Sequence, residues 1–389
     1  MGAMAPLAFV FGGVLFAPIV ACFAVAASRV TTTGGPYSYV EAAFGSLPGL
    51  AIACLLWISS VAGSGSMSAA LADQVALLVP RLAPPMPRAL FMLAIYATLV
   101  ALNSRGVKAG VTVIMAFAMA KLLPLVALAT VGFAYIDFAA VVPVAMPSWT
   151  SLGTSLVFVV FAYSGLETAL TPSGEMVNPE RVVPKAAFVG VGLVIVLYVA
   201  LQFVAQGVLG SNLGGANAPL ANVADVIAPG SGALFLLTAS VSLIGTIQGD
   251  LLGSSRLLYA LARDGFLPSS LAIVGARHAV PVRAVAAHAT VGWILATAGS
   301  FKTLALISGG AFCFVYIGCC AAAWRLQRQK IVAIGRAMTL PGGALIPGVA
   351  ILGLLAVLAT LSFAEWVAIG CVAAIATLSY AVRRHWMRG

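Results

Sequence analysis

The chain has 389 residues, of which 62% are hydrophobic and only 8% charged, and Lys and Arg exceed Asp and Glu by 20 to 10. A soluble domain carries roughly a quarter charged residues, so this composition excludes a water-soluble fold. Helices need ~20 apolar residues to cross a bilayer, whereas barrel strands need only ~10 with alternating polarity. The long apolar runs therefore predict an all-α polytopic membrane protein, and the positive excess indicates its orientation rather than nucleic-acid binding.

Eleven hydrophobic segments follow one another along the chain, and no soluble domain fits between them. Six cysteines lie inside these apolar runs and three histidines lie far apart, so neither a disulfide framework nor a metal site is expected. The segments span residues 4–27, 49–79, 89–103, 111–134, 151–172, 186–209, 231–258, 284–300, 303–324, 345–362 and 364–382.

Basic residues are distributed unequally between the two sets of loops. One set, with the C-terminal tail, carries 16 of them, and the other set carries only Arg81, Arg88 and Lys302. The positive-inside rule then predicts a cytoplasmic C-terminus, an external N-terminus and a location in the cell membrane. The 16 are Arg29, Arg105, Lys108, Arg181, Lys185, Arg256, Arg263, Arg277, Arg283, Arg325, Arg328, Lys330, Arg336, Arg383, Arg384 and Arg388.

The fifth segment is interrupted at Ser164-Gly165, and Glu167 follows. Unpaired backbone amides in lipid cost several kcal/mol each, so a break at this depth must line a cavity enclosed by protein. One interpretation is a helix with a flexible glycine and a structural glutamate. The other is a discontinuous helix at a substrate site. Its first half would then offer the carbonyls of residues 161–164, including that of Ala162, to an ammonium group.

Three stretches carry a family resemblance. FAYSGLE with GEMVNPERVVPKA resembles the sixth helix and following loop of permeases of the amino acid–polyamine–organocation superfamily. TTTGGPYSYVEAAFG at 31–45 resembles the loop between that family's second and third helices, and SSRLLYALARDGFLP at 254–268 resembles the end of its eighth helix. The resemblance implies a single LeuT-type transporter domain, a five-plus-five inverted repeat with two additional helices.

The same resemblance divides the chain. Residues 4–134 would form an incomplete first repeat, 151–324 the second repeat and 345–382 the two additional helices. Residues 4–27 fall on the family's second helix. The chain is therefore expected to contain 11 of the family's 12 helices, and the first of the 12 has no counterpart in it. We therefore expect either an in-frame coding extension upstream of Met1 or a truncated permease that does not transport.

Lys121 lies in the middle of segment 111–134, about 15 Å from either end at 1.5 Å per residue. A lysine stem cannot reach the interface from there, and desolvation penalises its charged form. Resemblance to the proton-coupled branch of the family implies that Lys121 is a proton acceptor whose partners are Ser254 or Ser255. The alternative is a lysine that neutralises a buried acid.

Glu167 has two candidate roles, which the sequence does not separate. As a first-turn carboxylate it stabilises the second half-helix through the helix dipole. Alternatively it takes up and releases a proton during transport, and the resemblance favours such a coupling or gating role.

Pocket walls follow from helical register. Ser59, Ser60 and Ser64 lie close to one face of segment 49–79 and resemble family positions at the substrate site. Small residues also serve close helix packing in membranes, so that alternative remains open. Phe161 resembles the family's aromatic gate on the sixth helix, although most aromatic residues in apolar helices only pack.

Asp250 lies inside segment 231–258 with no basic residue beside it on its own helix. In the resembled family this register faces the substrate pocket. A buried acid needs a positive partner, which is either Lys121 or a second cationic group on a substrate such as a basic amino acid or polyamine.

The sequence predicts a secondary active transporter of amino acids or related amines that works by alternating access. Its expected partners are a proton or counter-substrate and the lipid bilayer, a homodimer is left open, and no cofactor or metal is expected. The alternatives are a membrane-embedded hydrolase that uses Glu167 and Asp250 as a carboxylate pair, and a non-transporting remnant. No nucleotide-binding loop or hydrolase motif appears in the sequence.

Overall fold

The computed structural model describes residues 4–142, 148–171, 178–216, 218–275, 279–331 and 337–361, together with residues 366–367 and 370. Every regular element in these ranges is helical, which confirms the all-α fold class. The α-helices are α1 (Ala5–Arg29), α2 (Pro36–Phe44), α3 (Ser46–Leu78), α4 (Pro85–Asn103), α5 (Val107–Gly132), α6 (Trp149–Tyr163), α7 (Leu166–Leu170), α8 (Pro179–Leu209), α9 (Pro219–Ile227), α10 (Gly232–Arg263), α11 (Val282–Ala298), α12 (Phe301–Arg328) and α13 (Leu345–Leu358). Short 3-10 turns η2 (Pro80–Leu82), η3 (Phe133–Tyr135), η4 (Phe138–Val141), η6 (Gly210–Gly215) and η7 (Ser269–Ala272) connect them.

The predicted hydrophobic segments correspond to these helices. In the described part of the chain, 8 helices are long and apolar enough to cross a membrane, and α11 and α13 are shorter apolar helices. The predicted segment 364–382 lies almost entirely outside the described residues. α2 and α9 lie in stretches predicted to be connections, because nine residues each are too few to register as a hydrophobic segment.

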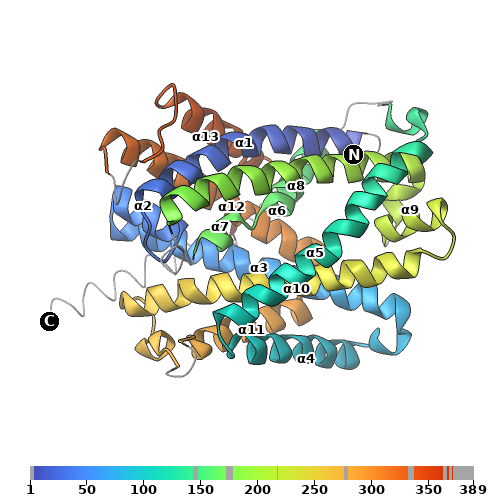
Figure 1. Cartoon of the computed structure of the whole chain (residues 1–389), viewed down its shortest axis with the longest axis horizontal. Helices are drawn as coiled ribbons and strands as arrows, with labels where there is room; N and C mark the ends of the chain where they lie inside the picture. The colour runs from blue at the N-terminus through green and yellow to red at the C-terminus, as the bar shows by residue number, and fades with distance from the viewer. Residues whose placement is uncertain are drawn as a thin grey trace.

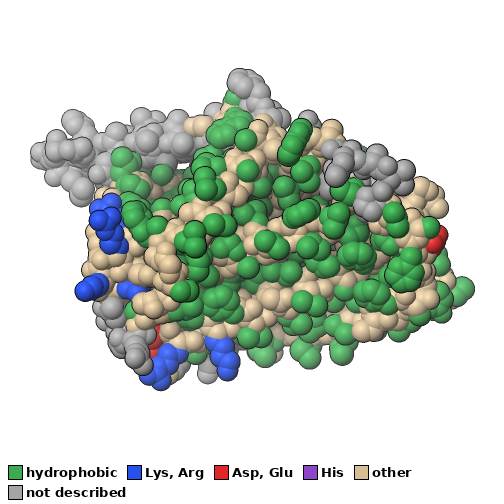
Figure 2. Space-filling model, turned by 90° about the horizontal axis from the view of Figure 1, so that it is seen from above, with side chains coloured by type: hydrophobic (Ala, Val, Ile, Leu, Met, Phe, Trp, Pro, Cys, Tyr) green, Lys and Arg blue, Asp and Glu red, His purple; other side chains and the backbone are tan. Residues whose placement is uncertain are grey.

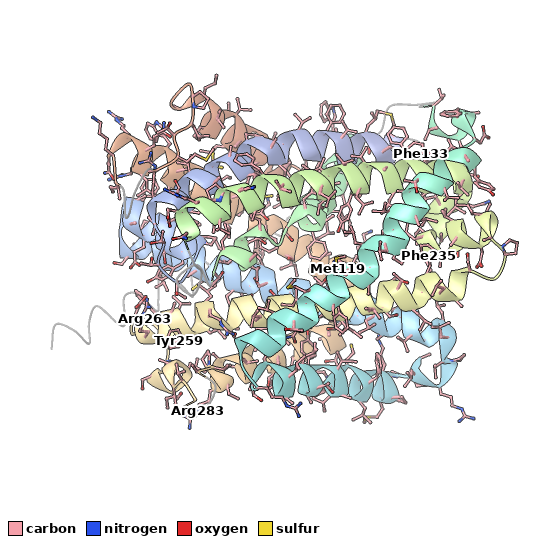
Figure 3. All side chains as sticks on the ribbon, in the orientation of Figure 1. Met119, Phe133, Phe235, Tyr259, Arg263 and Arg283 are labelled. Atoms are coloured by element: carbon pink, nitrogen blue, oxygen red, sulfur yellow. The ribbon has the colours of Figure 1, made fainter. Side chains whose placement is uncertain are left out.

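The long helices lie side by side along the longest axis of the molecule, with α2 at one end and α9 at the other (Figure 1). Arg263 and Arg283 lie at the α2 end, whereas Phe133 and Phe235 lie toward the α9 end (Figure 3). On the face drawn in Figure 2, Lys and Arg side chains gather at one end of a largely apolar surface. This arrangement is the one that the unequal loop charges require of a helical bundle in a bilayer.

The centre of the bundle is formed by α1, α3 and α12. Between 61% and 67% of the residues in their apolar windows are buried, compared with 17% in α4 and α8 and 11% in α5. Small residues bring these helices close together. A methyl group on Gly309 of α12 would lie 2.6 Å from the carbonyl oxygen of Val157 on α6, an approach that only glycine permits.

α2 lies at one end of the bundle and is bound to the end of α10. The Tyr37 hydroxyl donates a 2.9 Å hydrogen bond to the Asp264 carboxylate, and the Tyr37 side chain is fully buried. Burial, with the nearby carboxylates of Asp264 and Glu41, raises the pKa of the Tyr37 phenol. The neutral hydroxyl is therefore the form that holds α2 in place.

Tyr37→Phe is expected to lower the melting temperature in detergent, because a hydrogen bond to a charged group contributes about 1.5–3 kcal/mol. Since the phenol pKa is raised in the fold, this contribution is complete below about pH 10 and disappears as the pH rises through the folded value. Thermal unfolding followed at several pH values measures the difference. The control is Tyr135→Phe, whose ring is 49% exposed, and an equal loss in both variants would contradict the prediction.

Candidate functional site

The predicted interruption in the fifth hydrophobic segment is present between α6 and α7. Ser164 ends α6 in an extended conformation, and Gly165 has a φ of 126° that side-chain-bearing residues rarely adopt. A methyl group on Gly165 would meet no atom within 4 Å, so the break borders open space. The helix is therefore discontinuous where the sequence predicted it.

Glu167 fixes the geometry of this break. Its side chain is fully buried, and one carboxylate oxygen accepts a 2.8 Å hydrogen bond from the Gly165 amide. The other oxygen accepts a 2.9 Å hydrogen bond from the hydroxyl of Tyr316 on α12. Glu167 thus joins the start of α7 to α12 by two bonds, which agrees with the first-turn role and leaves the coupling role untested.

The carbonyl of Phe161 is not free for an ammonium group, contrary to the prediction for residues 161–164. It accepts hydrogen bonds from both the Ser164 amide, at 3.2 Å, and the Ser164 hydroxyl, at 2.7 Å. Ser164 thus caps the C-terminal end of α6, because the chain leaves the helix at this residue and the Phe161 carbonyl has no later helical amide to bond. Among the predicted carbonyls, those of Ala162, Tyr163 and Ser164 remain as candidate acceptors.

A cavity of about 1060 Å³ opens beside the first half of the broken helix. Lys121 is the one charged side chain among the described residues that line it, and Ala162 belongs to its wall. Polar groups facing it come from four helices and one turn: Gln74, Ser155, Tyr198, Gln202, Gln206, Ser211, Thr238 and Ser242. The cavity therefore combines an apolar wall with a single positive charge.

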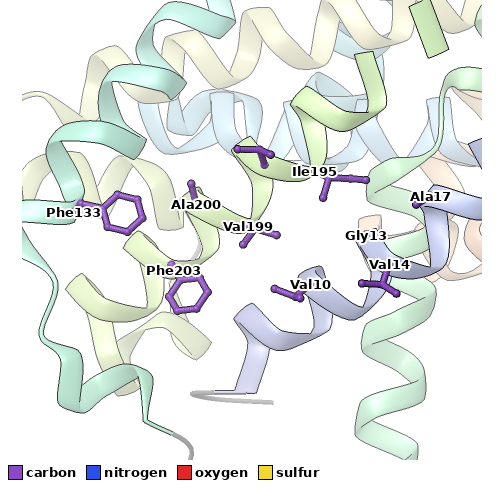
Figure 4. Close-up of a pocket in the computed structure, with 10 residues that line it drawn as sticks. Val10, Gly13, Val14, Ala17, Phe133, Ile195, Val199, Ala200 and Phe203 are labelled. Carbon is purple, nitrogen blue, oxygen red and sulfur yellow. The ribbon is translucent and has the colours of Figure 1, made fainter. Parts of the chain in front are cut away.

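A second cavity, of about 700 Å³, has a different character. It lies between α1 and α8 beside Phe133, and all ten residues that line it are apolar or glycine (Figure 4). Such a lining has no group that distinguishes a polar solute from a lipid tail. The polar cavity beside α6 is the candidate site for this reason.

A family model described as amino acid permease matches residues 1–381. The chain belongs to the amino acid permease family. It is 29% identical over 244 residues to the uncharacterized amino acid permease YecA of Bacillus subtilis (59% of this chain, 55% of YecA). It is 28% identical over 300 residues to Asc-type amino acid transporter 1 of Mus musculus (72% and 56%) and 29% over 233 residues to branched-chain amino acid permease BcaP of Bacillus subtilis (55% and 48%). These alignments span about half the length of each relative.

Lys121 and Asp250 of this permease do not pair. Asp250 Oδ2 lies 2.9 Å from Nε2 of His288 on α11, and Asp250 Oδ1 accepts a 2.8 Å hydrogen bond from Ser254. Within the described part of the chain, Lys121 has no hydrogen bond or ion pair. The prediction that Lys121 is the partner of Asp250 is therefore wrong.

The predicted serine partners of Lys121 are also engaged elsewhere. Ser254 bonds to Asp250, and the Ser255 hydroxyl donates to the Leu252 carbonyl and accepts from Arg256. α5 and α10 run in opposite directions, with Ile114 of α5 beside Gly249 and Phe117 beside Gly245. Continuing this register places Lys121 beyond Gly245, on the far side from the two serines.

The three serines predicted as pocket walls lie in the packed interior of the permease and not on the cavity. The Ser59 carbonyl accepts a 2.7 Å hydrogen bond from Ser308 of α12, and the Ser64 hydroxyl lies 2.9 Å from that of Tyr96. Ser60 is buried, and its hydroxyl has no partner among the described residues. Close helix packing accounts for Ser59 and Ser64, and a substrate contact remains a proposal for Ser60.

Phe161, the predicted gate, lies near the end of α6 beside α3 and α12, and its gating role stays a prediction. Its ring packs edge-on against Phe301, with ring centroids 6.5 Å apart. A methyl group on Gly63 of α3 would lie 3.4 Å from the Phe161 ring. The ring is 7% exposed, so a gating movement would require it to leave this packed position.

Sequence reasoning missed Trp57, His288 and Tyr316. A signal for His288 existed, because an ionisable residue inside a predicted span is a functional candidate by default. Tyr316 and Trp57 are aromatic residues in apolar helices, and nothing in the local sequence separates them from packing residues. Of the predicted hydrolase pair, Glu167 binds Tyr316 and Asp250 binds His288.

Proposed function

We propose that the chain moves amino acids across the cell membrane by alternating access. The supporting observation is the α6–α7 break, held by Glu167 beside a cavity that contains one positive charge. Broken helices at substrate sites are typical of secondary transporters. Membership of a family of amino acid permeases favours transport over hydrolysis, and the unequal loop charges support a cytoplasmic C-terminus.

We propose neutral rather than cationic amino acids as the substrate class. Asp250 was the predicted partner for a second cationic group on the substrate. Both of its carboxylate oxygens are already hydrogen-bonded, one to His288 and the other to Ser254. No acidic side chain occurs among the described residues that line the cavity. A cationic side chain would enter beside Lys121 without a counter-charge. BcaP, whose name specifies branched-chain amino acids, supports the same choice.

The test is uptake of labelled leucine into proteoliposomes, with leucine, alanine, lysine, arginine and putrescine as competitors. Leucine or alanine should compete best, and Asp250→Asn should not change the order of preference. Asp73→Asn is the matched control, because Asp73 is 59% exposed and pairs with Arg88. Preference for a cationic competitor that disappears in Asp250→Asn would restore the cationic class. If each of the five is then supplied in labelled form and none is taken up, the non-transporting remnant would be supported.

We propose that Lys121 presents its ammonium group to the carboxylate of the substrate. The role of Lys121 as a proton acceptor, expected from the family resemblance, is a second proposal. Lys121→Gln should raise the KM for uptake by about tenfold, because that change corresponds to about 1.4 kcal/mol, within the range of one ion pair in a partly solvated site. The melting temperature should not fall, since the ammonium has no partner among the described residues. Lys302→Gln, at the exposed start of α12, is the control. An unchanged KM would contradict the carboxylate role.

A further inference from the structure

Four polar side chains from three helices form a continuous chain of hydrogen bonds inside the bundle. Trp57 Nε1 of α3 donates to His288 Nδ1 of α11 at 3.2 Å, and His288 Nε2 lies 2.9 Å from Asp250 of α10. Ser254 donates to the second Asp250 oxygen. The His288 side chain is fully buried and that of Asp250 is 14% exposed. None of these residues lines the cavity beside α6.

The tryptophan determines where the histidine proton lies. An indole nitrogen can only donate a hydrogen bond, so His288 Nδ1 must offer its lone pair. The single proton of a neutral imidazole is therefore on Nε2, where it is donated to Asp250. In this arrangement His288 is neutral and Asp250 is ionised, so the pair carries one negative charge.

Among the described residues of the helices packed around Asp250, no Lys or Arg side chain forms an ion pair with it, and Lys121 of α5, which packs against α10, does not reach it. Glu167 of α7 and Tyr96 of α4 both interact electrostatically with Asp250, and neither side chain carries a positive charge. The segment η7 has no titratable side chain, and the acid of α3, Asp73, pairs with Arg88 toward the C-terminal end of α3. On α10, Arg256 is turned to the Leu252 carbonyl and Ser255, and Arg263 pairs with Asp264. On α11, Arg283 lies at the α2 end of the molecule (Figure 3).

We propose that the Asp250–His288 pair is the site that binds the proton whose movement drives uptake. This inference rests on the transport function proposed above. A net charge inside membrane helices is costly, and one proton brings the pair to neutrality. The proton would add to His288 Nδ1, and the resulting imidazolium would keep its bond to Asp250 but lose the one from Trp57, because both nitrogens would then be donors.

The α6–α7 break is close enough to respond to this charge. Asp250 interacts electrostatically with Glu167, the carboxylate that holds the break. One turn along α10, Gly253 contacts α7 so closely that a methyl group there would lie 2.6 Å from the Thr168 carbonyl oxygen. We therefore expect a change in the charge of the pair to act on Glu167 and, through the Gly253–Thr168 contact, on the position of α7.

His288→Gln is the decisive variant, because a glutamine can accept from Trp57 and donate to Asp250 yet cannot become charged. With an inward proton gradient, wild-type proteoliposomes should take up labelled leucine at least about tenfold faster than without one. His288→Gln should lose this stimulation and retain leucine exchange at equal pH. Asp250→Asn should do the same, because its pair carries no negative charge to neutralise.

Trp57 provides a second readout that does not depend on transport. The fluorescence contribution of Trp57, obtained as wild type minus Trp57→Phe, should differ between neutral and acidic pH, because protonation of His288 Nδ1 removes the hydrogen bond from Trp57. The change should be absent in His288→Gln. A flat titration in the wild type overturns the inference even where a variant fails to fold.

The remaining outcomes also decide between proposals. Gradient stimulation that survives in His288→Gln but is lost in Lys121→Gln assigns the proton to Lys121 and overturns the inference. Wild-type exchange of leucine with no response to a gradient overturns the proton site and leaves the transport function standing. Absence of any exchange by the wild type counts against the transport function itself.

Discussion

Glu167→Ala is expected to reduce leucine uptake by more than about tenfold and to lower the melting temperature. The substitution leaves the Gly165 amide and the Tyr316 hydroxyl without their acceptor in a fully buried place. Each unsatisfied buried group costs about 1–3 kcal/mol, and 1.4 kcal/mol is a factor of ten in an equilibrium. Initial uptake rates in proteoliposomes and thermal unfolding in detergent measure the two effects.

Two further variants separate the bonds that Glu167 makes. Tyr316→Phe removes only the α12 bond and should give a smaller loss of stability. Glu167→Gln keeps an oxygen that accepts from the Gly165 amide, and its NH2 group can donate to the Tyr316 hydroxyl, so its effect should be smaller than that of Glu167→Ala. If Glu167→Ala transported at the wild-type rate, Glu167 would have no role in holding the break.

Gly165→Ala is expected to impair transport through the backbone alone. A φ of 126° is strained for any residue with a side chain, at a cost of about 1–3 kcal/mol. The added methyl group meets no atom within 4 Å, so a steric clash does not contribute. Uptake should fall several-fold as the break shifts toward a continuous helix, while the protein remains folded.

Gly190→Ala is the matched control for this substitution. Gly190 also has open space around its Cα, but it lies in the interior of α8 without a positive φ. Alanine is favoured over glycine in a helix interior by about 1 kcal/mol, so uptake and stability should be maintained. Equal losses in Gly165→Ala and Gly190→Ala would show that the positive φ of the break is not required for transport.

The sequence by itself determined the helical class, the positions of the spans and the break at Ser164-Gly165. These features are local, because hydropathy over a window of about 20 residues decides whether a segment enters the bilayer. The asymmetry of basic residues is likewise read loop by loop. The glycine at the break could be identified because few other residues tolerate its backbone conformation.

Only the tertiary structure decided which polar side chains meet. Asp250 pairs with His288, 38 positions away, and Glu167 binds Tyr316, 149 positions away. Lys121 lies on a helix that packs against α10 yet reaches neither Asp250 nor the serines beyond it. In helices that are apolar on every face, the sequence pattern does not mark which face meets a neighbour. That choice depends on where small residues such as Gly253 and Gly309 let helices approach, and the approach fixes the register of every buried polar pair.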